Sequence, residues 1–408
     1  MKEQRLRELL QEAPLPAAEE AERRGRRMVE AAFAARRSPH RRAAPHRLAL
    51  ALAAATLILA VVLSPAGATV RDWIDETLGV GVRDAEPALT EIPGGGRLLV
   101  SSPQGAWLVR ADGSRRLLGA YEEATWSPRG LFVAAASGHT LSAVAPDGTV
   151  RWSLSAPGEV GQPRWSPSGE RIAYRSGKTL RVVAGDGSGD GIDHPLLDDR
   201  VGAVAPAWVP GGPHLLAYLD AGNEIRVVDA DTGEVVGSGD ALPGTRALAW
   251  APDRSQLLEV ARGSLWIRRI AAGKVALRVD VGPAQRLSVP AAGRFHDAAF
   301  SPDGEAVAAL RSLPGARGRP PRSELVLLDL NGGSSRVLFR GPGRLSGLAW
   351  SPDGERLLIS WPDADQWLFI PADGRGRVRA IGGVSAEFSP GAAPGTGWFP
   401  RLDGWCCY

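Results

Sequence analysis

The chain has 408 residues, 44% hydrophobic and 23% charged, a composition that fits a folded protein and excludes a disordered one. Its formal net charge of +3 is unevenly placed, because residues 1–47 carry 12 Lys and Arg against 7 Glu, or +5, which leaves −2 for the remainder. The larger part has no basic surplus to offer phosphate, so we expect no nucleic-acid partner.

Residues 1–47 form a basic segment that we expect to be helical and cytoplasmic. Two helical stretches, residues 2–12 and 17–37, are separated by Ala-Pro-Leu-Pro. The second carries a short apolar stripe at positions i, i+1, i+4 and i+5, made of Met28, Val29, Ala32 and Phe33. Two interpretations stay open: the helix only sets membrane topology, or the stripe docks a cytoplasmic regulator or an anionic lipid surface.

Residues 48–70 are an uncharged stretch of 23 residues between Arg47 and Arg71. About 20 apolar residues in a helix cross a bilayer core of about 30 Å, so this stretch predicts one transmembrane helix. A cleaved signal peptide is the main alternative, since residues 66–68 (Ala-Gly-Ala) fit a cleavage site, and a buried soluble helix is another. The long segment before the stretch favours an uncleaved anchor. Arginines precede it and acidic residues follow it, which places residues 71–408 outside the cytoplasm.

Residues 71–96 are expected to form a juxtamembrane helix and a linker. Trp73, Ile74, Thr77 and Leu78 share one face of the helix, and Gly79 ends it.

From residue 97 to 390 one phrase recurs, an aromatic residue followed by Ser-Pro-Asp-Gly or a variant of it. The aromatic residues are Trp126, Trp165, Trp208, Trp250, Phe300, Trp350 and Phe388, with successive spacings of 39, 43, 42, 50, 50 and 38. Short β-rich runs bounded by Gly, Asp and Asn turns follow each one. This period predicts an all-β fold, a β-propeller in which the aromatic packs between sheets and the phrase makes a turn.

The two ends of the repeat region complement each other. Residues 97–119 supply later strands of a unit without its aromatic turn, whereas residues 385–390 supply the turn without the strands. A C-terminal strand that joins the N-terminal ones closes the ring and removes open edges. We therefore expect seven four-stranded antiparallel blades, with six as the alternative if the last copy only begins a tail over residues 391–408. Cys406 and Cys407 are expected to be unpaired thiols in that tail, rather than a vicinal disulfide or a cross-link.

The recurring Trp-Ser-Pro-Asp-Gly phrase resembles the repeats of TolB-type, WD40-like propellers, and the resemblance covers residues 97–390. Propellers of this kind serve as docking platforms, as periplasmic partners and as accessory domains of peptidases, so the resemblance implies a fold and not one function. The variants Trp-Val-Pro-Gly-Gly at Trp208 and Trp-Ala-Pro-Asp-Arg at Trp250 depart from the pattern.

A search for chemistry yields little. Neither the Gly-x-Ser-x-Gly elbow nor the His-Glu-x-x-His motif occurs, so we expect no enzyme, no catalytic residues and no cofactor. One glycine-rich loop resembles a calcium loop, with oxygen ligands at Asp186, Ser188, Asp190 and Asp193. Leu197 stands where such a loop needs a bidentate Glu, so a hairpin turn is the preferred interpretation and we expect no metal site.

The first functional hypothesis is an anchored extracytoplasmic propeller that binds a protein, peptide or glycan, or acts as a sensor. A second is a regulator, because a cytoplasmic helix, one span and an external domain resemble the layout of bacterial membrane-bound anti-sigma factors. A third is a propeller enzyme, a glycan lyase or peptidase relative. Acidic and His side chains that converge at the channel mouth would favour the enzyme.

Overall fold

The computed structural model describes residues 89–188, 194–195, 201–272, 278–289, 293–315, 321–389 and 397–407. Within these ranges, no helix is both long and apolar enough to cross a bilayer. The predicted cytoplasmic segment, the predicted span and most of the juxtamembrane segment lie outside the described residues.

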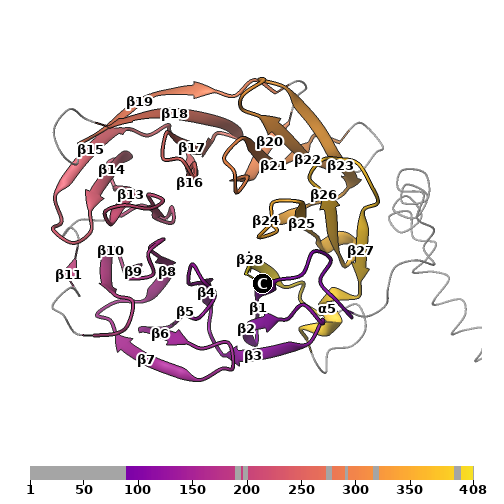
Figure 1. The fold of residues 1–408 in the computed structure, drawn as a ribbon, viewed down its shortest axis with the longest axis horizontal. Coiled ribbons are helices and arrows are strands. Elements are labelled where there is room, and N and C mark those ends of the chain that lie inside the picture. The colour runs from indigo at the N-terminus through magenta and orange to yellow at the C-terminus, as the bar shows by residue number, and fades with distance from the viewer. Residues whose placement is uncertain are drawn as a thin grey trace, which may run out of the picture. The chain divides into compact units, whose positions relative to one another are not determined.

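Seven four-stranded antiparallel sheets stand around a common axis, as Figure 1 shows. The expectation of a seven-bladed, all-β propeller is confirmed, and the six-bladed alternative is wrong. Blade 1 comprises β28 (Arg401–Cys406), β1 (Arg97–Ser102), β2 (Gly105–Val109) and β3 (Arg115–Gly119). Blade 2 comprises β4 (Glu123–Trp126), β5 (Val133–Ser137), β6 (Thr140–Val144) and β7 (Val150–Ser155). Blade 3 comprises β8 (Val160–Trp165), β9 (Arg171–Ser176), β10 (Thr179–Ala184) and β11 (His194–Pro195).

The remaining four blades follow in chain order, each starting with its innermost strand. Blade 4 comprises β12 (Ala207–Trp208), β13 (Leu215–Leu219), β14 (Glu224–Asp229) and β15 (Val235–Asp240). Blade 5 comprises β16 (Thr245–Trp250), β17 (Gln256–Ala261), β18 (Ser264–Ala272) and β19 (Val279–Arg286). Blade 6 comprises β20 (Arg294–Phe300), β21 (Ala306–Leu313), β22 (Arg322–Asp329) and β23 (Ser335–Pro342). Blade 7 comprises β24 (Ser346–Trp350), β25 (Arg356–Trp361), β26 (Gln366–Pro371) and β27 (Arg379–Gly382). Two short helices, η2 (Pro362–Ala364) and α5 (Val384–Glu387), complete the elements.

The Ser-Pro-Asp-Gly phrase is the turn between the first two strands of a blade. In blade 6, Asp303 Oδ1 accepts the N–H of Glu305 at 3.0 Å, and the hydroxyl of Ser301 donates to the same carboxylate. Gly304 has a φ of +78°, a conformation that glycine adopts without a steric penalty. The phrase recurs because blades 2 to 7 each need a turn between their first and second strands, as the sequence predicted.

Three of the recurring tryptophans, Trp208, Trp250 and Trp350, donate a hydrogen bond to the preceding blade. Trp208 Nε1 donates to the carbonyl of Arg164 at 2.8 Å, and Trp250 Nε1 donates to that of Ala207 at 3.1 Å. Each acceptor lies on the innermost strand of the preceding blade, one residue before its own aromatic. These bonds satisfy carbonyls that have no neighbouring strand on the channel side.

The ring closes one segment later than the sequence indicated. The strand that pairs with β1 is β28, so the segment expected to be a tail contains the innermost strand of blade 1. Phe388, taken from the sequence as the aromatic of this unit, instead follows α5 and is buried against Trp107 and Trp367, with ring centroids 5.8 and 5.5 Å away. Trp405 takes the expected position and donates to the carbonyl of Gly95 at 2.9 Å.

The end of β28 also carries the two cysteines. Cys406 and Cys407 are joined by a disulfide beside Gly130 of the neighbouring β4–β5 turn, so the expectation of unpaired thiols in a tail is wrong.

Candidate functional site

The two faces of the propeller carry different parts of each blade. We call the face at which the innermost strands begin the bulge face. The opposite face holds the Ser-Pro-Asp-Gly turns, and we call it the turn face. Because strands alternate in direction, the bulge face also collects the turns between second and third strands and the connections between blades.

Five innermost strands have a β-bulge or irregular pairing close to the bulge face: β8, whose register shifts between Gly161 and Arg164, and four strands with a single additional residue. In β16, β20, β24 and β28 one residue has no partner in the pairing with the next strand: Arg246, His296, Gly347 and Asp403. A bulge redirects the side chain of the additional residue away from the regular alternation of the strand. In three of these four strands the additional residue is polar, so the bulges place the side chains of Arg246, His296 and Asp403 near the propeller axis on the bulge face, which we call the channel mouth.

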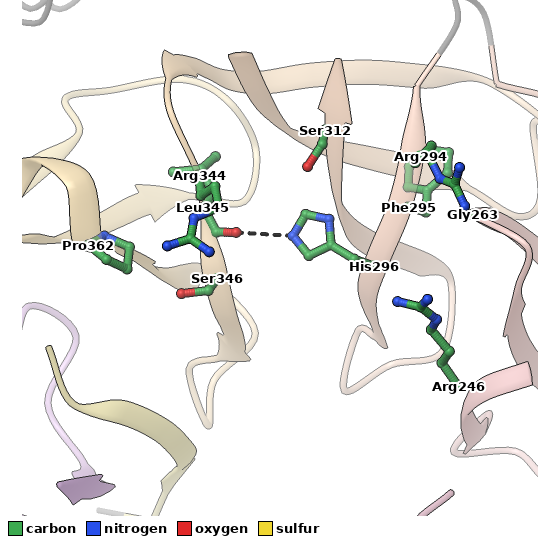
Figure 2. Close-up of a pocket in the computed structure, with 10 residues that line it drawn as sticks. All are labelled: Arg246, Gly263, Arg294, Phe295, His296, Ser312, Arg344, Leu345, Ser346 and Pro362. Carbon is green, nitrogen blue, oxygen red and sulfur yellow. Dashed lines mark hydrogen bonds between the residues drawn. The ribbon is translucent and has the colours of Figure 1, made fainter. Parts of the chain in front are cut away.

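A pocket of about 460 Å³ lies on the bulge face between blades 5, 6 and 7 (Figure 2). Its lining consists of Arg246, Gly263, Arg294, Phe295, His296, Ser312, Arg344, Leu345, Ser346 and Pro362. In Figure 2 the side chains of Arg246 and Arg344 lie on either side of the His296 ring. No carboxylate belongs to this lining, so the pocket is cationic.

The three pocket arginines differ from other arginines of the same blades in their partners. Arg268 and Arg311 are buried and pair with Glu259 at 2.8 Å and with Glu324 at 2.6 Å. Arg246, Arg294 and Arg344 are exposed, and none of them has an ion-pair partner among the described residues. These three arginines place positive charge at the pocket that no neighbouring carboxylate side chain pairs with, and this charge favours an anion.

The connection that presents Arg344 is held in place by four bonds. Trp361 Nε1 donates to the carbonyl of Pro342 at 3.0 Å, and the hydroxyl of Ser323 donates to that of Gly343 at 2.8 Å. The N–H of Arg344 donates to Asp363 Oδ2 at 2.8 Å. His296 Nε2 lies 3.0 Å from the carbonyl of Leu345, which only accepts, so Nε2 carries the proton. A fixed loop lowers the conformational entropy lost on binding a ligand.

Next to His296 lies a partly buried carboxyl group with a raised pKa. Burial raises the pKa of Asp297 to about 6, against an ordinary value of 3.8, although the backbone N–H groups of Ala298 and Leu348 and the nearby His296 act in the opposite direction. Asp297 thus links β20 to β24 at the channel mouth and titrates in the mildly acidic range.

We expect Asp297 to weaken the fold as the pH rises from about 4 to about 6. The pKa is higher in the folded state than in the unfolded chain, so the folded state holds the proton more tightly within this window. The free energy of unfolding should fall by roughly 2–3 kcal/mol across it and then stay level. Urea unfolding of Asp297→Asn and of the parent chain at pH 4, 5, 6 and 7 tests this. Parallel pH profiles of the two proteins would show that Asp297 does not titrate as stated.

On the other side of the channel mouth the charges already have partners. Asp403 Oδ1 accepts from Arg401 Nε at 2.8 Å, and its other oxygen accepts from the hydroxyl of Ser101. Glu123 Oε2 accepts the N–H of Gln162 at 2.7 Å. Burial raises the pKa of Asp403. These carboxylates are engaged in holding blades 1 to 3, and no group of three or more His, Cys, Asp or Glu suited to a metal occurs among the described residues.

A Ser-His-Asp arrangement occurs on the turn face between blades 3 and 4. His214 Nε2 lies 3.1 Å from Ser168 Oγ, and His214 Nδ1 lies 2.7 Å from Asp231 Oδ2. Nε2 also lies 3.0 Å from Glu170 Oε2. The nitrogen that would take a proton from the serine thus faces a carboxylate, and the N–H of Glu170 donates to the same hydroxyl at 3.2 Å. This is a polar contact between blades rather than an activated nucleophile.

The two candidate sites from the sequence have different outcomes. The stripe of Met28, Val29, Ala32 and Phe33 lies outside the described residues. In the glycine-rich loop, the N–H of Ser188 donates to Asp186 Oδ1 at 2.8 Å, as in an Asx turn. Asp190 and Asp193 lie outside the described residues, so the loop stays a prediction.

The pocket residues were missed in the sequence. Arg246 and His296 each precede their aromatic by four residues, in the strand sequences TRALAW and RFHDAAF. A polar residue at the same place in two successive units was the available signal.

Comparisons with known proteins find similar solved structures but no matching family. No protein-family model and no curated protein matches the chain. Among solved structures, the β-propeller domain of Cps50 (Swd1) from Myceliophteria thermophila is 15% identical with a TM-score of 0.45, over 64% of this chain and 85% of that chain. The C-terminal WD40 domain of Sif2 is 12% identical with a TM-score of 0.48, over 72% of this chain and 84% of that chain.

A third similar structure is a 6-phosphogluconolactonase, described as putative, from Bacteroides fragilis NCTC 9343. It is 17% identical with a TM-score of 0.48, over 71% of this chain and 94% of that chain. The sheet topology itself shows that the chain has a seven-bladed β-propeller fold.

Proposed function

We propose that this chain is a membrane-anchored propeller that binds a partner protein outside the cytoplasm, through an acidic segment of the partner seated in the cationic pocket. The pocket carries the proposal: three exposed arginines without carboxylate partners among the described residues surround one concave site. Guanidinium groups bind carboxylates through two parallel hydrogen bonds, which gives both affinity and orientation.

The shape and lining of the pocket fit a peptide side chain better than a free inorganic ion. A volume of about 460 Å³ falls in the range of sites for organic ligands. Phe295 and Leu345, both mostly buried, and Pro362 add apolar surface beside the arginines. An Asp or Glu side chain with its neighbouring backbone uses both kinds of surface. Binding of this kind is a docking function and needs no catalytic group.

The anchor and the orientation rest on the sequence. An uncharged stretch over residues 48–70, preceded by arginines, supports a single span with the propeller outside. In that arrangement, a sensor would transmit the binding of a partner at the bulge face to residues 1–47. Protease added to intact cells should digest the propeller only if it lies outside, and protection until lysis would contradict the orientation.

We expect the full chain, in lipid nanodiscs, to bind a fluorescein-labelled peptide of alternating Asp and Gly in preference to the matched Asn–Gly peptide. Fluorescence polarisation measures the affinity. Arg246→Gln and Arg344→Gln should each weaken binding about tenfold, because each removes a charge-assisted pair worth about 1.4 kcal/mol. Added salt should weaken binding by the parent chain more than binding by the variant that carries both Arg246→Gln and Arg344→Gln.

Matched controls come from the turn face. Arg375 and Arg377 are exposed arginines of the β26–β27 connection, and their change to Gln removes equal charge far from the channel mouth. The double control variant should bind like the parent chain. Equal binding of the Asp and Asn peptides, or equal loss in the control and pocket variants, would count against the proposal. Competition by phosphate at equal strength would indicate a general anion site instead.

A further inference from the structure

A second pocket, of about 510 Å³, lies on the turn face between blades 4 and 5. It is lined by the β12–β13 and β16–β17 turns, by the end of β18 and by the start of β19, and it shares no residue with the lining of the cationic pocket on the other face. Its volume also falls within the range typical of small-molecule sites.

The floor and one wall of this pocket are apolar. Val209, Leu215 and Trp250 are buried, and Ile270 and Val279 pack against the same hydrophobic cluster. Trp250 Nε1 donates to the carbonyl of Ala207 at 3.1 Å, so the polar atom of the ring is occupied and the remaining ring surface is apolar.

Close strand packing fixes the Val279 wall. A β-carbon placed on Gly237 of β15 would come within 2.2 Å of the carbonyl oxygen of Val279 on β19. The backbone of β19 therefore lies directly against β15, and the wall is a rigid part of the blade interface. A preformed apolar wall favours a ligand with an apolar body.

Two arginines stand at the rim of this apolar pocket. Arg254 and Arg278 line it, and neither has an ion-pair partner among the described residues. The one acidic residue of the lining, Asp253, is used within its own turn, where Ser255 donates to it from the N–H at 3.0 Å and from the hydroxyl at 2.6 Å. The two guanidinium groups thus remain available to a ligand.

Arg254 occupies a backbone position that other blades give to glycine. Its φ is +66°, and the corresponding Gly304 and Gly354 have φ of +78° and +74°. A residue with a β-carbon is strained in this region. Among the described residues the guanidinium has no hydrogen-bond or ion-pair partner that would compensate the strain, and it lies against Gly212 of the neighbouring blade. A strained arginine beside an apolar pocket points to a ligand that supplies the missing anion.

We propose that the turn-face pocket binds a small amphiphilic carboxylate, with its apolar body on Trp250, Leu215 and Val279 and its carboxylate between Arg254 and Arg278. This site is independent of the proposed docking function on the bulge face. The ligand is a single small molecule, because the apolar lining is a small group of side chains around one pocket of about 510 Å³.

The test uses 4-phenylbutyrate as the probe and isothermal titration calorimetry of the full chain in lipid nanodiscs, with empty nanodiscs as the reference. We expect one site per chain, and at least tenfold weaker binding of 4-phenylbutan-1-ol, which lacks the carboxylate. Arg254→Gly should weaken 4-phenylbutyrate at least fivefold without lowering the melting temperature, since glycine relieves the backbone strain. Ala271→Trp, which fills the pocket from an exposed strand position, should abolish binding.

The matched control is Arg262→Gly. Arg262 also has a left-handed backbone, with φ of +52°, but it lies in the β17–β18 turn on the bulge face. This variant should gain the same relief of strain and bind 4-phenylbutyrate like the parent chain. Equal binding of the acid and the alcohol, no binding by the parent chain, or unchanged binding by Arg254→Gly would overturn the proposal. Acidic-peptide binding should be unchanged in Arg254→Gly, so the two proposals fail separately.

Discussion

A chain that ends at residue 398 is expected to lose the cooperative unfolding transition of the propeller. The missing β28 is the innermost strand of blade 1, and it pairs with β1 along most of its length. Its loss would expose the edge of β1, remove the burial of Trp405 and open the ring between blades 7 and 1. Deleting a buried tryptophan alone costs about 3–5 kcal/mol, and a domain has only about 5–15 kcal/mol in total. Differential scanning calorimetry should show no single sharp transition for the truncated chain.

Point variants separate ring closure from a general effect of the C-terminal segment. Trp405→Ala should lower the free energy of unfolding by about 3–5 kcal/mol, because the side chain packs on Phe369 at a centroid distance of 5.5 Å. Trp398→Ala should change it by less than about 0.5 kcal/mol, since Trp398 is 71% exposed. A truncated chain that melts at the temperature of the full chain, or equal effects of the two tryptophan variants, would show that β28 does not close the ring.

The blades were predictable because the signal for each is local. Pro, Asp and Gly form a turn within four residues, and the strand that precedes it ends in an aromatic residue that reaches the neighbouring blade. Such a unit can be recognised from residues that are close together in the sequence. Repetition then predicts the ring, since one blade cannot bury its faces alone.

The position of the strand that closes the ring was predicted wrongly for the same reason. Phe388 is followed by Ser-Pro-Gly and so has the local signature of a blade, yet it lies at the end of α5 and fills a space between Trp107 and Trp367. Trp405 lacks the signature because no strand follows β28, so no turn is required. Which aromatic completes the ring depends on pairing with β1, more than 300 residues earlier in the chain.

The cationic pocket was not predictable, because it exists only after three blades are packed together. Arg246, His296 and Ser346 are 50 residues apart in turn, and no short motif contains two of them. The bulges that redirect Arg246 and His296 are features of strand pairing, which the residue pattern does not show. The repeat length of these blades places equivalent residues side by side, so the spacing becomes informative once the ring is known.

The arginines of blades 5 and 6 include one group inside the blades and another at the cationic pocket. Arginines inside the blades have buried glutamates, whereas those at the cationic pocket have none among the described residues. The pocket therefore depends on the interior pairs, because Arg311 also lies over Phe295, whose ring centroid is 5.8 Å from the guanidinium carbon. A change to this ion pair inside blade 6 should therefore alter the packing of Phe295 at the pocket wall.

Glu324→Gln is expected to lower the free energy of unfolding by about 3 kcal/mol. Glu324 is fully buried and accepts from Arg311 at 2.7 Å and from Arg340. Removing its charge leaves the buried guanidinium of Arg311 without a compensating carboxylate, a loss typically of 3–5 kcal/mol. Arg340→Gln should cost less than about 1 kcal/mol, because Arg340 is half exposed and Glu324 keeps Arg311.

Replacing both charges should recover most of that loss. Glu324→Leu combined with Arg311→Met removes the buried ions together, and a well-packed apolar pair can equal a buried ion pair in stability. Urea unfolding curves with a common slope would compare the three variants with the parent chain. If Glu324→Gln and Arg340→Gln differed by less than 1 kcal/mol, the glutamate would not be compensating the buried arginine. The distinction between interior arginines, which buried glutamates compensate, and pocket arginines, which they do not, would then be wrong.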